Sequence, residues 1–107
     1  MSDVTGPIGP QSKKEYEREY QQSADLFQRA LDQYHKSDNP YQRQEFKDVM
    51  DQAMQILNEA AHGLMRKELE EQNRKIAKDY QNFQKHPKDP DSLNKLSRDL
   101  DQAKRSV

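Results

Sequence analysis

The spacing of apolar residues along this chain predicts a helical protein. From Tyr16 to Tyr34, aromatic and small residues recur at steps of four, three, four, three and four. This is the heptad spacing, which keeps one side of an α-helix apolar. Ser12 and Glu15 have the spacing of a capping box, in which two side chains satisfy free backbone amides of the first turn. We therefore predict a first helix over residues 12–36.

The next segment, residues 40–85, carries the longest periodic stretch. Its first half again steps four, three, four, three and four, from Phe46 to Leu64. Asn39 is a suitable N-cap, and Pro40 fits the first position of a helix. We predict a long central helix over about residues 40–85, and the short connection before it makes the first helix its antiparallel neighbour.

The apolar spacing changes inside this central segment. The step from Leu64 to Leu69 is five residues, which belongs to neither half of a heptad. Either the helix continues while its apolar seam shifts around it, or it ends at Gly63 with a glycine C-cap and restarts. Continuity is the favoured interpretation, because no N-cap residue or proline follows the glycine. A break there would instead give a more compact bundle.

The second half of the segment is sparsely apolar. Polar Gln72 or Asn73 falls where an apolar seam residue would be expected. A buried amide at this position would set the register of the helices at some cost in stability. The alternative is a solvated helix with little surface to cover.

A third helix is predicted over about residues 90–105. Asp89 and Pro90 repeat the cap-then-proline order of the earlier turn, and Leu93, Leu96, Leu100 and Ala103 follow at steps of three, four and three. The predicted fold is therefore all-α, with three antiparallel helices, coiled-coil-like heptad packing, and two shorter helices folded back on a long central one. It forms a single domain over residues 12–107. Residues 1–11 contain two glycines and two prolines and are expected to be a flexible N-terminal arm.

Charge and composition narrow the functional classes. Eighteen basic and nineteen acidic residues nearly cancel and are interspersed, which argues against wholesale disorder and against nucleic-acid binding. No apolar run approaches membrane-spanning length and no hydrophobic signal core begins the sequence, so no membrane association is expected. We expect a cytoplasmic protein, with secretion by a signal-independent route left open.

Residues that would carry catalytic or metal chemistry are sparse. The chain has no cysteine, and its three histidines lie far apart. Glu59 and His62 form a single Glu-x-x-His pair, whereas a di-iron bundle needs that motif twice. No phosphate-binding glycine loop or nucleophile elbow is present. We expect no catalytic, cofactor-binding or metal-binding residue and no small-molecule substrate, so an enzyme or metal-binding bundle comes last among the hypotheses.

A second apolar stripe points to a protein partner. Val49, Ile56 and Gly63 follow each other at intervals of seven and lie beside the first stripe, giving more apolar surface than one helix covers. Met54 and Met65 suit adaptable contacts, although methionines that fill a core look the same in sequence. These five residues are the predicted partner-binding surface. The favoured function is a non-catalytic helical interaction or assembly module that self-associates as a dimer or larger oligomer.

One local motif suggests an alternative function. The stretch from Pro87 to Leu96, with its Pro-x-Asp-Pro turn and following leucines, resembles the loop of the small helical-hairpin subunits of type III secretion needles. Those subunits are shorter and have one hairpin. The resemblance implies assembly through the apolar faces of a hairpin, and so a secretion-associated helical subunit or a small chaperone.

Overall fold

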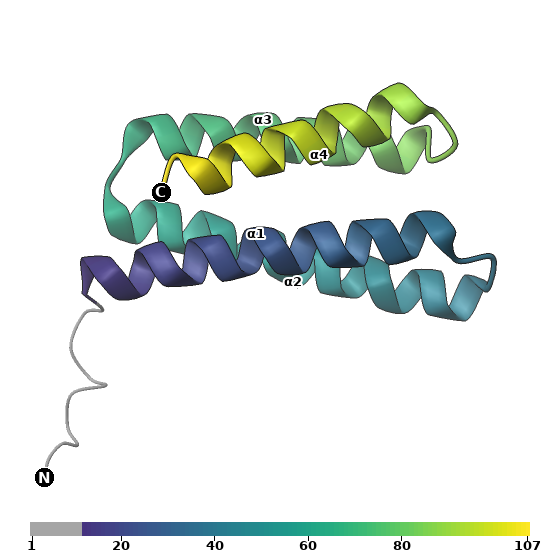
Figure 1. The fold of residues 1–107 in the computed structure, drawn as a ribbon, viewed down its shortest axis with the longest axis horizontal. Coiled ribbons are helices and arrows are strands. Elements are labelled where there is room, and N and C mark those ends of the chain that lie inside the picture. Colours follow the sequence, from purple (N-terminus) through teal and green to yellow (C-terminus); the bar gives the residue numbers. More distant parts are fainter. Residues whose placement is uncertain (1–11) are drawn as a thin grey trace, which may run out of the picture.

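The computed structural model describes residues 12–107, and the predicted N-terminal arm lies outside this range. Four helices follow in order, α1 (Lys13–Lys36), α2 (Pro40–Leu64), α3 (Lys67–Lys85) and α4 (Pro90–Arg105). The first two form one antiparallel hairpin and the last two form another, and the hairpins lie side by side (Figure 1). The prediction of an all-α fold is confirmed, but the number of helices is four rather than three.

The four helices surround one core. Helix α2 lies beside α1 and α3, and α4 lies beside α3 and α1. Consecutive helices run in opposite directions (Figure 1). All four helices contribute fully buried side chains to this core, the largest being Tyr20, Phe27, Leu31, Met50, Leu57, Leu69, Ile76, Phe83, Leu96 and Leu100. No helix within residues 12–107 is both long and apolar enough to cross a membrane.

Three of the four helix starts have the local chemistry that the sequence predicts. The amide of Glu15 donates a hydrogen bond to Ser12 Oγ at 3.2 Å. The Glu15 carboxylate accepts one from the amide of Ser12, and this second bond completes the capping box. Asn39 Oδ1 accepts from the amide of Tyr41 at 2.8 Å. Asp89 Oδ1 accepts from the amide of Asp91 at 3.0 Å. Because these caps need only neighbouring residues, the helices begin where the sequence places them.

The prediction of one continuous helix over residues 40–85 is wrong. Helix α2 ends at Leu64, Met65 adopts a left-handed conformation with φ of 56°, and α3 begins at Lys67. At 3.6 residues per turn, a straight helix would place the buried residues of α3 about 120° around the axis from those of α2. Both sets could not then face one core. The break turns the apolar side of α3 back towards it.

Gly63 remains inside α2, two residues before the left-handed position, so it is not the glycine C-cap of the alternative interpretation. The ring of Tyr16 in α1 lies directly against it, and a Cβ atom at position 63 would collide with that ring. The glycine therefore serves close helix packing. Met65 supplies the left-handed turn instead, at a cost of roughly 1 kcal/mol for a residue with a side chain.

A buried amide joins three helices. Asn73 is 2% exposed; it accepts a hydrogen bond from the Tyr20 hydroxyl at 2.6 Å and donates one to the Leu57 carbonyl at 3.0 Å. Burial raises the pKa of Tyr20 to about 12, against the opposing charge of Arg66, so the hydroxyl keeps its proton. Of the two interpretations left open for this position, a buried amide and a solvated helix, the structure shows the buried amide at Asn73, while Gln72 is only partly buried.

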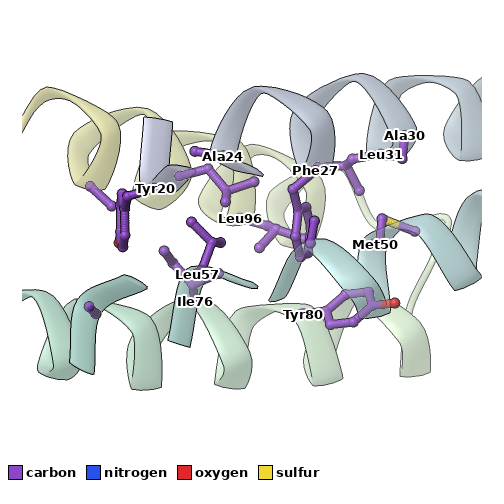
Figure 2. Packing of buried hydrophobic residues seen from close by; sticks show 14 of the residues in the cluster. Tyr20, Ala24, Phe27, Ala30, Leu31, Met50, Leu57, Ile76, Tyr80 and Leu96 are labelled. Atoms are coloured by element: carbon purple, nitrogen blue, oxygen red, sulfur yellow. The ribbon is translucent and has the colours of Figure 1, made fainter. Parts of the chain in front are cut away.

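Aromatic side chains join the two hairpins diagonally across the core. Phe27 of α1 meets Tyr80 of α3 edge to face, with ring centroids 5.1 Å apart (Figure 2). The Tyr80 hydroxyl donates to Asp51 Oδ1 of α2 at 2.6 Å. Burial, and next the hydrogen bond to Asp51, raise the pKa of Tyr80 far above its usual value. Apolar packing and a charge-assisted hydrogen bond thus fix the position of the second hairpin on the first.

Candidate interaction surface

An apolar groove runs between α1 and α2 on the side of this hairpin that faces away from α3 and α4. Its lining comes only from the first two helices and consists of Leu26, Arg29, Ala30, Gln33, Phe46 and Val49. Leu26 is 42% exposed, while its neighbour Phe27 is fully buried in the core. Since successive helical residues lie about 100° apart, a side chain next to a core residue points to the flank of the helix. The groove is therefore the outer seam of the hairpin.

Two of the five predicted partner-binding residues share this face. Val49 lines the groove directly. Ile56 lies seven residues further along α2, so it projects from the same side of the helix and is partly exposed. Together with Leu26 they form a surface that we call the outer face, defined by Leu26, Val49 and Ile56.

The other three predicted residues lie elsewhere. Met54 is partly buried and packs against the core. Gly63 lies beneath the ring of Tyr16. Met65 is 85% exposed at the turn between α2 and α3, beside a shallow hollow that also includes His62 and Glu70. The structure therefore does not bring the five residues into one patch.

Sequence reasoning missed Leu26 and assigned Phe46 only to the first apolar stripe. A signal for Leu26 was present, because it lies four residues before Ala30 and three after Ser23, just off the main seam of α1. That position matches the place of Val49 and Ile56 beside the main seam of α2. Leu26 on α1 and Val49 on α2 each lie beside the main apolar stripe of their helix. Because the two helices pack side by side, these side chains meet and line the groove.

A pair of buried carboxyl groups lies at the other hairpin, between α3 and α4. Asp79 and Asp99 are each 5% exposed, and one oxygen of each has no hydrogen-bond partner in the described part of the chain. Lys95 Nζ approaches Asp79 Oδ1 at 3.7 Å, and this lysine is itself largely exposed. Burial, followed by the hydrogen bond and the negative charge of Asp99, raises the pKa of Asp79 to about 6, and Lys95 opposes the shift.

This carboxyl pair was not predicted. On a chain so rich in charge, Asp79 and Asp99 look like ordinary surface residues until the packing of α3 on α4 is known. Because two neighbouring buried carboxylates repel each other, Asp79 and Asp99 favour a state in which they share one proton. Within residues 12–107, no group of three or more acidic or histidine side chains is arranged to hold a metal ion.

Comparison of the chain with protein-family profiles, with curated proteins and with solved structures gives no match.

Proposed function

We propose that the protein is a non-catalytic helical interaction module that binds a protein partner through the outer face. The observation that carries this proposal is the exposed position of Leu26 above a groove floored by Ala30 and Phe46. Only three large hydrophobic side chains of the described residues are exposed, and Leu26 is the one that lies in an apolar groove. An apolar groove with a polar surround is typical of a protein-binding surface.

The geometry of the groove suits a helical partner. Two antiparallel helices leave a furrow between them, and the ridge of side chains on another helix fits into such a furrow. Phe46 and Val49 also pack against the core, so the floor is held rigidly by the fold. A preformed floor lowers the entropic cost of binding, because few side chains have to be ordered when the partner arrives.

Site-specific photo-crosslinking in the native host tests the proposal. A photoreactive phenylalanine analogue placed at Leu26 is expected to form a discrete protein adduct. The same analogue at Gln81, an exposed position on α3 remote from the groove, is the matched control. The proposal is supported by an adduct at position 26 that is absent at position 81. Equal labelling at both positions, or none at position 26, would contradict it.

A secretion-associated helical subunit is a second candidate. It is favoured by the arrangement of α3 and α4, which form a hairpin whose turn, residues 86–89, contains Pro87 and ends at the cap residue Asp89. This is the segment that resembles the needle subunits. Purification of the protein from its native host would recover other components of a secretion system if this candidate is correct. Failure to enrich any such component would count against it.

A further inference from the structure

We infer that the occupant of the outer face is a second copy of the same chain, related by a two-fold axis that runs parallel to α1 and α2. This inference rests on the proposed function, since it names the partner that the same groove would accept. It is carried by the charges along the two edges of the groove and by the register of α1 against α2.

Two arginines lie on the α1 edge of the groove and two carboxylates lie on the α2 edge, while Glu15 and Glu19 also place carboxylates on the α1 side, near the start of that helix. On α1, Arg29 lines the groove, three residues after Leu26, and Arg18 lies three turns earlier on the same outer edge. On α2, Asp48 and Glu59 lie on the outer edge next to Val49 and Ile56. The two arginines and the two α2 carboxylates are exposed, and no ion pair within residues 12–107 involves them.

The register of the hairpin sets these charges at matching heights. The guanidinium of Arg43 lies 5.2 Å from the centre of the Tyr34 ring, so these two residues mark one level of α1 and α2. Because the helices are antiparallel, every step forward along α1 is a step backward along α2. Counting from this level places Arg29 near the level of Asp48 and Arg18 near that of Glu59, and the contact between Tyr16 and Gly63 agrees with this register to within two residues.

With a two-fold axis along the groove, residues at the same level of α1 and α2 come into contact between the two copies. The axis lays α1 of one copy over α2 of the other and leaves the position along the helix unchanged. Arg18 then meets Glu59 of the second copy and Arg29 meets its Asp48, and each pair occurs twice because of the symmetry. An axis across the helices would instead lay α1 on α1 and bring arginines together. Like charges opposed in this way disfavour that arrangement.

The apolar and aromatic residues fit the same arrangement. Leu26 would lie over the Val49 and Ile56 stripe of the second copy, which would cover the partly exposed side chains of the outer face. Tyr41, which is 82% exposed, lies at the level of Lys36. The axis therefore brings the Lys36 ammonium of one copy to the Tyr41 ring of the other, where a cation–π contact is favourable.

Sedimentation equilibrium of the full chain, from about 1 μM to 1 mM, tests the inference. We expect a species of twice the 12.7 kDa chain mass at the upper concentrations, and dissociation as salt rises. Arg18→Glu and Glu59→Arg are each expected to weaken the dimer roughly tenfold, and the double variant R18E/E59R to restore it. Leu26→Lys should abolish the dimer while circular dichroism shows an unchanged helix content.

Each result that differs from these expectations would overturn a particular part of the inference. A strictly monomeric protein at 1 mM would overturn self-association, and an adduct of another protein at position 26 would still support the proposed function. A dimer that the double charge exchange fails to restore would overturn the two-fold arrangement. A dimer that Leu26→Lys leaves intact would place the interface elsewhere and overturn the inference entirely.

Discussion

The buried carboxyl pair predicts an unusual dependence of stability on pH. A carboxyl group whose pKa is higher in the folded than in the unfolded chain favours folding when it is protonated. The pKa of Asp79 rises from 3.8 to about 6 on folding. Its contribution is therefore fully present below pH 3.8 and is lost as the pH rises through 6. This is opposite in sign to an ordinary ion-paired aspartate.

The size of the effect follows from the shift. A rise of a little over two pH units corresponds to about 3 kcal/mol, since one unit is worth about 1.4 kcal/mol. Small domains unfold with free energies of about 5–15 kcal/mol, so the pair controls a sizeable part of the total. Asp79→Asn removes the charge and keeps the shape of the side chain. Its amide can also donate to the Asp99 carboxylate, which lacks such a donor when both groups are ionised.

Urea unfolding of the wild type and of Asp79→Asn between pH 4 and pH 8 measures the effect. The variant should be more stable than the wild type by about 3 kcal/mol at pH 8, and the difference should shrink to well under 1 kcal/mol at pH 4. Asp101→Asn is the matched control, because Asp101 is exposed on α4, two residues after Asp99, and pairs only with Arg105 one turn away. A difference between wild type and Asp79→Asn that stays flat across this pH range would refute the reasoning.

Three further predictions concern the packing between helices. Gly63→Ala should lower the free energy of unfolding by about 1–3 kcal/mol in urea, because the new methyl group collides with Tyr16; Tyr16→Ala should remove most of this penalty. Met65→Gly should raise the melting temperature by relieving about 1 kcal/mol of left-handed strain, and a lower value would contradict this account of the turn. Asn73→Ala should cost about 1–3 kcal/mol in urea unfolding by leaving the Tyr20 hydroxyl without its acceptor, and the cost should be smaller in a Tyr20→Phe background.

The parts of the fold that depend on neighbouring residues could be predicted from the sequence. The starts of α1, α2 and α4 are set by Ser12, Asn39 and Asp89, and each of these caps acts on an amide two or three residues away. The apolar stripe also marked Gln72 or Asn73 as a polar interruption, but whether that amide is buried stayed open until the packing of the helices was known. Local chemistry and periodicity therefore gave the fold class and most helix boundaries.

The parts that depend on distant residues could not be predicted. Gly63 is needed because the ring of Tyr16, which is far away in sequence, packs directly against it; the sequence alone offered only a possible helix end there, in the less favoured interpretation. The raised pKa of Asp79 requires Asp99 from another helix. Leu26 becomes part of a groove only when α1 lies against α2. In each case the property belongs to a pair of helices, and neither helix alone carries it.

The turn between α2 and α3 shows the difference between local sequence and tertiary packing. Unlike the starts of α2 and α4, the start of α3 has no proline at its first positions, and Arg66 makes no side-chain capping hydrogen bond. Met65 even adopts a backbone conformation that disfavours its own side chain. Glu68 and Glu70 in the first turn of α3 suit a helix start, but acidic residues in a charge-rich segment do not by themselves favour a break. The core favours the break, because a straight helix would turn the buried face of α3 about 120° away from that of α2. Tyr16 on Gly63 and Asn73 on the Leu57 carbonyl hold the chain on either side of the turn, so the bend is a consequence of tertiary packing.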